Sequence, residues 1–429
     1  MELITSRPLS TVPLSPVDVF NSVSYPTLMF LYRQGLDVTR LKEALRTVLA
    51  EVPDVAGRLI KRDGQYCIAW NDAGVGFDVI DVNTAMPDYG FANPTVEAPP
   101  LSSLPNPAKI VNADLPLCRF QVTRFRCSAA ILTMHISHVL CDGFGRGWFL
   151  ARWARICRGA PALPPMDVDR NTLIRIAELY DKVGGANAFK MMRAGELKKQ
   201  FEAFHRGPFS LKALRVSAAE LTALRDKTIV GLKGERISRQ DVLVAKVWRT
   251  LALAQPDPSP GKLFLVQDFR RNAEFGLGEH YFGNAVTTTS LDHDAADIAQ
   301  QPLGILAQRI RTNTIKALSF ERIAADLAFQ WRHATVDGAS LAVPKEWVDF
   351  PKNQLGINNF SRFPLSELDF GTGAPFWVFG NLWASGRSVT IFPLIRPDDP
   401  GYAVYINIPE DHLRSLLPII ADDPFFHTD

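Results

Sequence analysis

A histidine and an aspartate four residues apart are the side chains of this sequence best suited to chemistry. His138 and Asp142 stand in residues 131–145, where an apolar, β-prone stretch leads into the histidine and glycines follow the aspartate. A histidine at the end of a buried strand can present a near-neutral imidazole to a cavity, as a general base requires. The spacing alone is weak evidence, because 8 histidines and 45 acidic residues give it by chance in roughly a third of such chains. A core histidine that merely satisfies a hydrogen bond is the alternative interpretation.

The elements around this pair must place the imidazole at an open site. Strand patterns occur at residues 120–125 and 129–135, and a helical pattern at 144–157 follows the aspartate. His135 precedes His138 by three positions, so on a strand it faces the opposite side and is expected to be a packing residue. The pair therefore lies where a buried strand meets a helix.

Strands and helices alternate irregularly along the rest of the chain. Further elements are expected as strands at residues 28–32, 55–60, 66–70, 263–267, 376–379, 388–393 and 402–408, and as helices at 38–50, 171–204, 216 onward, 238 onward, 296–317, 320–330 and 411–417. This order favours the α/β class with mixed sheets covered by helices. Because 429 residues exceed one ordinary core, we predict domains at 1–185 and 216–429 with a connector at 186–215.

Composition excludes several classes of function. The net charge is +2 with both signs interspersed, and no run reaches about 18 apolar residues. Neither a nucleic-acid partner nor a membrane is therefore expected, and the N-terminus does not resemble a signal peptide. The five cysteines have no disulfide or zinc spacing, so no metal is expected and the thiols are predicted to be reduced core residues. We predict a soluble cytoplasmic protein.

Five separated segments occur in the order and spacing of one known family. They are residues 14–18, residues 55–59, His138 to Gly143, Asp268 to Arg271 with Tyr281 to Ala285, and Ser361 to Pro364 leading into Asp369, Phe370, Gly371, Thr372 and Gly373. Together they resemble the BAHD family of acyl-CoA-dependent acyltransferases over nearly the whole chain.

The resemblance implies a fold, a co-substrate and roles for residues. It implies two chloramphenicol-acetyltransferase-like domains with a channel between them, no permanently bound cofactor, and acyl-CoA and a small acceptor as co-substrates. It implies that His138 is a general base without a covalent acyl-enzyme, and that Asp142 forms a supporting salt bridge with Arg270. The motif at Asp369, Phe370, Gly371 and Gly373, like Gly143, is then structural.

Two departures from the family pattern bear on the site. Thr372 stands where relatives usually have tryptophan, and residues 358–360 read Asn-Asn-Phe where relatives often have Thr-Ser-Trp. Asn358 is a candidate oxyanion donor, because its amide can donate where relatives carry a hydroxyl. Weaker substrate-binding candidates are Tyr25, Tyr32, Phe360 and Ser361.

The substrates are only partly constrained. Acetyl is the default acyl group, and a hydroxyl or amine of a specialised metabolite is the expected acceptor. Because the channel would be complete within one chain, a monomer is expected. Two alternatives remain: a carrier-protein-dependent condensation-type domain, which would have histidine where this chain has Ser137, and a catalytically silent metabolite-binding protein.

Overall fold

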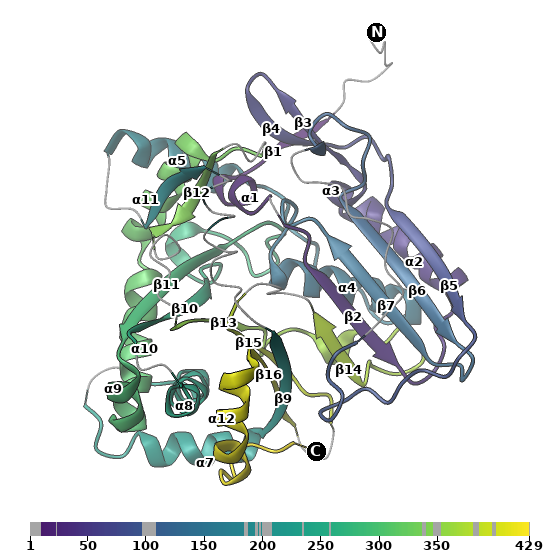
Figure 1. Ribbon diagram of the computed structural model, residues 1–429. Coiled ribbons are helices and arrows are strands. Elements are labelled where there is room, and N and C mark those ends of the chain that lie inside the picture. The colour runs from purple at the N-terminus through teal and green to yellow at the C-terminus, as the bar shows by residue number, and fades with distance from the viewer. Residues whose placement is uncertain are drawn as a thin grey trace.

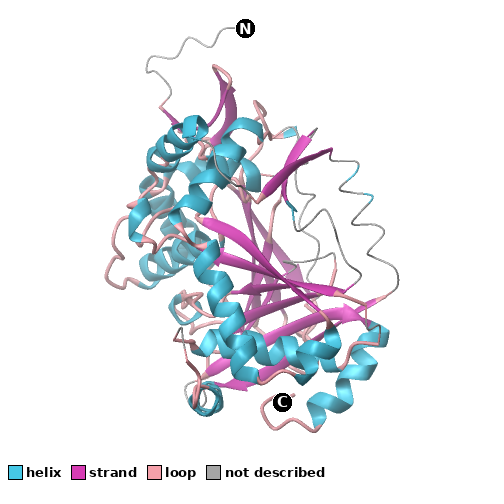
Figure 2. Cartoon of the chain, turned by 90° about the vertical axis from the view of Figure 1, so that its left-hand side faces the viewer, coloured by secondary structure: helices cyan, strands magenta, loops and turns pink. Residues whose placement is uncertain are grey.

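Two large sheets, each covered by helices, dominate the structure (Figure 1). The computed structural model describes residues 10–22, 24–96, 109–183, 188–193, 196, 199, 208–233, 236–256, 259–336, 340–345, 353–380, 386–396 and 400–428. In Figure 2 the helices gather along one side and the lower end of the strands. The mixed α/β class predicted from the sequence is confirmed.

The first large sheet has five strands and holds the strand that leads to His138. Its order is β14 (Trp377–Gly380), β2 (Thr27–Tyr32), β7 (Ala130–Ile136), β6 (Cys118–Phe125) and β5 (Gly76–Val82). One face packs against α4 (Gly143–Arg158), where Phe120 of β6 contacts Phe149 and Trp153. Behind α4 lies α2 (Val38–Glu51), whose Leu41 carbonyl accepts a hydrogen bond from the Trp153 indole N–H.

The second large sheet has six strands and a purely helical cover on one face. Its order is β11 (Val286–His293), β10 (Gly261–Asp268), β13 (Asn353–Asn359), β15 (Ser388–Pro393), β16 (Gly401–Pro409) and β9 (Phe209–Ser217). Its helices are α7 (Ala218–Thr228), α8 (Arg239–Leu253), α9 (Ala295–Gln300), α10 (Leu303–Ala317) and α12 (Glu410–Ala421). Ser238 and Asp241 form a capping box that starts α8, where the sequence predicts a helix from residue 238.

Two small sheets and shorter helices complete the described chain. One sheet joins β1 (Thr11–Pro13), β4 (Gln65–Ala69) and β3 (Arg58–Arg62), and the other joins β8 (Phe189–Arg193) and β12 (Ser340–Pro344). The remaining helices are α1 (Pro16–Asn21), α3 (Pro53–Ala56), α5 (Asn171–Val183), α11 (Phe320–His333) and two single 3₁₀ turns, η2 (Ala273–Phe275) and η4 (Leu365–Glu367).

The described part of the predicted connector contains strands of two sheets. Residues 186–215 contain β8 and most of β9, and β9 pairs with β16 along its whole length. The first sheet also takes β14 from the predicted second domain, and Figure 1 shows this yellow-green strand beside the purple β2. Strand partners are chosen by tertiary packing, which local sequence patterns do not encode.

Three element boundaries also differ from the prediction, each for a local reason. Pro53 opens the short helix α3 where a strand was expected from residue 55, because proline suits the first helical position. The predicted helix at 296–317 is two helices separated at Pro302, which lacks the N–H a continuous helix needs. The predicted helix at 171–204 ends as α5 at Val183, before Gly184-Gly185, and the next described strand is β8.

Cysteines and helix lengths add two further observations. All five cysteines are free, and only Cys127 is exposed, which agrees with the predicted core role of the others. Within the described ranges, no helix is long and apolar enough to cross a lipid bilayer.

A buried arginine joins the segments that surround the histidine motif. Arg170 has no exposed surface and donates to Asp18 Oδ2 at 2.8 Å and to Asp54 Oδ2 at 2.6 Å. It also donates to the Leu140 carbonyl at 3.0 Å, two residues beyond His138. The two carboxylates raise the pKa of Arg170, against burial. The ion cluster thus ties α1 and α3 to the loop after β7.

Arg170→Met should lower the free energy of unfolding by about 3–5 kcal/mol, because it leaves two buried carboxylates without their cation. Urea denaturation followed by circular dichroism measures this. The control is Arg175→Met at the start of α5, since Arg175 is exposed and donates a long hydrogen bond to Thr172. Equal stability of the two variants would contradict the role given to Arg170.

Candidate active site

The two large sheets face each other, and the registers show which side chains lie between them. Trp377 of β14 pairs with Leu31 and lies on the face of the first sheet opposite α4. Its ring centroid is 5.4 Å from that of Tyr405 in β16, and the Tyr405 hydroxyl donates to the Val378 carbonyl. Thr390 and Asn358 share a face with Tyr405 through direct register pairs. Asn358 therefore points toward the first sheet.

His138 follows β7 by two residues and is held by its main chain. Its N–H donates to the Ser24 carbonyl at 2.9 Å, and its carbonyl accepts from Asn284 Nδ2 at 2.8 Å. The residue is half-buried between fully buried neighbours, Ser137 and Val139. These contacts fix the imidazole in place while part of the residue remains exposed.

Asn284 determines which ring nitrogen of His138 carries the proton. Its Nδ2 donates to Asp18 Oδ1 at 2.7 Å and to the His138 carbonyl, which are both acceptors. The amide oxygen must therefore face His138 Nδ1, which lies 2.8 Å away and donates its proton. A neutral imidazole then has its lone pair on Nε2. This is the tautomer that a general base needs.

Burial and a neighbouring cation keep the imidazole of His138 neutral. Burial and the charge of Arg146 lower the pKa of His138 to about 3, and Asp142 opposes them. Arg146 shares the sheet-facing side of α4 with Phe149 and Trp153 and is 2% exposed. Its Nε and Nη2 have no hydrogen-bond partner among the described residues. A buried positive charge thus lies near the base, on the helix side of the sheet, and Asp142 offsets part of it.

Asp142 is turned away from the imidazole and bonds three groups. Its Oδ2 accepts from Arg270 Nη2 at 2.8 Å and from the Ala285 N–H at 2.9 Å, and its Oδ1 caps α4 through the Gly145 N–H at 3.0 Å. Burial alone would raise the pKa of Asp142, but Arg270 and these N–H groups hold it below the usual value. The structure thus brings together the pair Asp142–Arg270 named from the sequence.

Gly143 allows a close approach between the histidine motif and the second half of the chain. A Cβ atom at Gly143 would lie 2.2 Å from Cε1 of Phe360, so this glycine makes room for the Phe360 ring. Phe360 also stacks on Phe392 of β15 with centroids 5.1 Å apart. Asn358 and Ser361 flank Phe360 in sequence, and all three are half-buried. The segment named from the sequence therefore reaches the start of α4.

The two tyrosine candidates occupy different places. Tyr25 follows Ser24, whose carbonyl bonds the His138 N–H, so it lies beside the motif. Burial raises the pKa of Tyr25 to about 12. Tyr32, by contrast, is 1% exposed and donates to the Leu368 carbonyl at 3.0 Å. It pairs with Ala130 at the start of β7, about 20 Å along the strand from the end that leads to His138. Tyr32 was proposed from the sequence as a substrate-binding residue, but the structure places it in the core.

The motif at residues 369–373 forms a turn at the opposite end of α4. Asp369 Oδ1 accepts from the N–H groups of Gly371 at 2.7 Å and Gly373 at 2.9 Å. Both glycines have positive φ, 106° and 95°, which explains their residue type. Arg158, the last residue of α4, donates to the Asp369 carbonyl at 2.8 Å, while Phe370 packs on Trp153. Because α4 is about 22 Å long, this turn lies far from His138.

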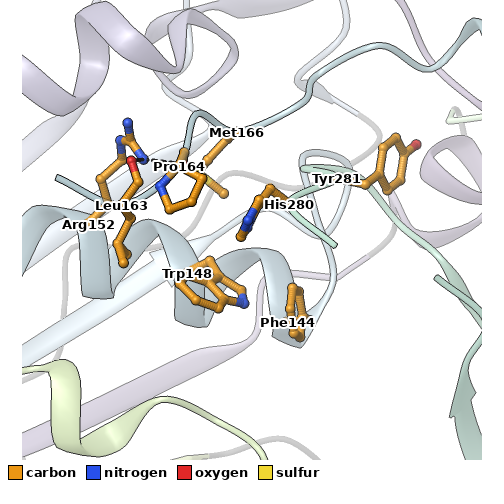
Figure 3. Close-up of a pocket in the computed structure, with 8 residues that line it drawn as sticks. All are labelled: Phe144, Trp148, Arg152, Leu163, Pro164, Met166, His280 and Tyr281. Carbon is orange, nitrogen blue, oxygen red and sulfur yellow. Dashed lines mark hydrogen bonds between the residues drawn. The ribbon is translucent and has the colours of Figure 1, made fainter. Parts of the chain in front are cut away.

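A separate shallow depression beside α4 is lined by Phe144, Trp148, His280 and their neighbours (Figure 3). Phe144 and Trp148 project into it from α4, with His280 opposite Trp148 at a centroid distance of 5.4 Å. His138 does not line it. Among the described residues, no group of three or more histidine, cysteine, aspartate or glutamate side chains could hold a metal ion.

Two functional candidates were missed from the sequence. Asn284 lies in the segment that carried the resemblance, but a buried asparagine at an imidazole looks like any loop asparagine before folding. Arg146 reads as an ordinary helix cation, and only its 2% exposure makes it unusual. The signal for both was proximity in sequence to motif residues.

Comparisons with known proteins agree with this geometry. The sequence model of the family described as the Transferase family matches residues 5–417. The chain belongs to this family, the BAHD acyl-CoA-dependent acyltransferases. It is 28% identical over 404 residues to a hydroxycinnamoyl-CoA:5-hydroxyanthranilate N-hydroxycinnamoyltransferase of Avena sativa, covering 90% of this chain and 86% of the relative.

Two further comparisons extend this result. Putrescine hydroxycinnamoyltransferase 1 of Oryza sativa subsp. japonica is 30% identical over 398 residues, covering 87% of this chain and 86% of the relative. The structure of F. graminearum TRI101 with coenzyme A and T-2 mycotoxin has a TM-score of 0.72 at 16% identity and covers 95% of this chain and 97% of TRI101. The fold is therefore that of the two-domain BAHD acyltransferases.

Asn284→Ala should lower kcat by about 10²-fold with little change in KM, because the Nδ1 proton and hence the Nε2 lone pair are no longer held in place. Steady-state thiol release measures both constants. The control is Asn313→Ala, which removes a distant amide that bonds Thr289 and Ser290. If Asn284→Ala turned over as fast as the control variant, the tautomer argument would fail.

Arg146→Met should raise the pKa of His138 toward 6.5, because a positive charge near the ring disfavours its protonation. Activity is lost as pH falls through the pKa of the base, so the acidic limb of kcat/KM should move to higher pH. The matched control is Arg155→Met in α4, which is not among the groups that shift His138. An acidic limb at the same pH in both variants would exclude this electrostatic effect.

Proposed function

We propose that this acyltransferase transfers an acyl group directly from a CoA thioester to a hydroxyl or amine, with His138 Nε2 as general base. The observation that carries the proposal is the hydrogen bond from His138 Nδ1 to Asn284 Oδ1, which leaves the Nε2 lone pair available. As the acceptor oxygen or nitrogen bonds the thioester carbon, Nε2 takes its proton. When the carbon–sulfur bond then breaks, Nε2–H returns that proton to the CoA thiolate.

Several neighbours support this cycle. Asn284 Oδ1 accepts from Nδ1 throughout, so it favours the imidazolium formed between the two proton transfers. Asn358 is proposed as the oxyanion donor, because its side chain points from the second sheet toward the first. Phe360 and Ser361 follow it, and we assign them to the substrate walls, together with Tyr25 beside the motif. Asp142 and Arg270 hold the loop rather than the ring.

The acyl group and the acceptor are proposed on separate grounds. An acetyl group is the default from the sequence, whereas the relatives described above are named hydroxycinnamoyltransferases. Both groups therefore belong in the first assay. One of these relatives is named for an N-transfer and the other for putrescine, so amines are acceptors to test beside alcohols. A cytoplasmic location and a monomeric state are parts of the same proposal.

His138→Ala should lower turnover by about 10² to 10⁴-fold, because a positioned base contributes that much. The assay follows free thiol from acetyl-, malonyl- and hydroxycinnamoyl-CoA with alcohols and amines, and identifies products by mass. His333→Ala, at the end of α11, is the control for loss of a histidine elsewhere. A His138→Ala variant with the turnover of the control would refute the assignment.

Two further measurements separate the alternatives. Intact mass after acyl-CoA alone should show no acylated protein, and an acylated form would replace the direct mechanism by a covalent one. A condensation-type domain would ignore free acyl-CoA and accept only a carrier-bound acyl group. A silent binding protein would be stabilised by its ligand without releasing thiol from any donor.

A further inference from the structure

The face of β7 turned away from α4 is polar although it is buried. Met134 and Ile136 point to the α4 side and are fully buried. Thr133 and His135 alternate with them on the other face, at 2% and 6% exposure. A strand buried on both faces is normally apolar on both, so the polar face needs a separate explanation.

Two side-chain atoms on this face of β7 lack hydrogen bonds within the described ranges. Thr133 Oγ1 and His135 Nε2 are buried without a partner among the described residues. His135 Nδ1 lies 2.8 Å from Thr27 Oγ1 across the β2–β7 ladder, so only Nε2 of the ring is unused. An unsatisfied buried polar group costs about 1–3 kcal/mol. Two such groups, about 7 Å apart on the same side of one strand, therefore mark a place for a ligand.

The position of these groups relates them to the reaction centre. Trp377 lies on the same face of this sheet and contacts Tyr405 of the second sheet, so Thr133 and His135 belong to the face that the second sheet approaches. His135 precedes His138 by three residues, about 10 Å of extended chain. A group bound here would thus belong to the far end of a substrate whose reacting atom lies at His138.

The chemistry of the two groups selects the kind of ligand. Burial and the charge of Arg119 lower the pKa of His135 to about 4, so the ring is neutral near pH 7. Its Nε2 is then an N–H donor or a lone-pair acceptor, depending on the direction of the Thr27 contact, and the Thr133 hydroxyl can do either. A ligand hydroxyl group can both donate and accept a hydrogen bond, so it can pair with Nε2 of His135 in either tautomer and with the Thr133 hydroxyl.

We propose that Thr133 and His135 bind a hydroxyl group at the end of the substrate remote from the reacting atom, and so select hydroxylated substrates. The inference rests on the proposed function of His138. The hydroxyl can belong to the acyl donor, as in a hydroxycinnamoyl group, or to the acceptor. Its hydrogen bonds are made equally in the ground state and transition state, so they act on KM rather than on kcat.

The test compares pairs of substrates that differ by one hydroxyl. The donor pair is 4-coumaroyl-CoA and cinnamoyl-CoA with one fixed acceptor, and the acceptor pair is an aromatic amine with and without a ring hydroxyl, such as tyramine and phenethylamine, with one fixed donor. Thr133→Val is isosteric and removes only the hydroxyl, while His135→Phe removes Nε2. In the pair that uses this site, KM for the hydroxylated member should rise about five- to tenfold, with kcat and the KM of the other member unchanged.

The matched control is Thr123→Val, a buried threonine on the same face whose hydroxyl already accepts from Gln121 Nε2 at 3.1 Å. It should leave the KM ratio of both pairs at the wild-type value. A wild-type enzyme that shows no preference within either pair overturns the inference, as does an unchanged ratio in both Thr133→Val and His135→Phe. Absence of turnover with every acyl-CoA would instead refute the proposed function.

Discussion

The amide of Asn284 is the contact on which the geometry of the site depends. It joins a buried carboxylate, Asp18, to the catalytic candidate, His138, and its two ends are chemically distinct. Because the carboxylate takes the amide N–H, the amide oxygen is left for the imidazole. Asp18 thus sets the tautomer of an imidazole that it does not itself bond. Arg170 in turn bonds Asp18 and the loop after His138, so one ion cluster orients both the amide and the base.

The charged groups around this contact differ in how well they are paired. Asp142, Arg270, Asp18 and Arg170 are all committed to ion pairs and backbone hydrogen bonds. Arg146 is equally buried, but its Nε and Nη2 have no hydrogen-bond partner within the described part of the chain. A buried ion without a partner is expensive and is seldom retained unless it does something. Its effect on His138 gives a physical reason: a cation behind the imidazole makes protonation unfavourable and keeps the lone pair free.

Large parts of the fold could be predicted from residue patterns. Apolar spacing identified α2, β6, β7 and α4, and Ser238 marked the start of α8. The boundaries that failed did so where a proline opened a helix early, as at Pro53, or divided one, as at Pro302. The place of β14 in the first sheet could not be predicted, because the sequence of a four-residue strand does not indicate which strand it will pair with.

Residue patterns alone identified the histidine, its supporting ion pair and the family. The spacing of His138 and Asp142, with the later segments at Arg270 and Asp369, indicated the fold class and which residue acts as base and which as support. The directions of the side chains emerged only from the folded structure. It turned Asp142 to Arg270, buried Tyr32 in the core, and placed Asn284 at the imidazole. The reason is physical: spacing along a chain fixes which face a residue occupies, but hydrogen-bond partners more than 100 positions away exist only after the sheets have packed.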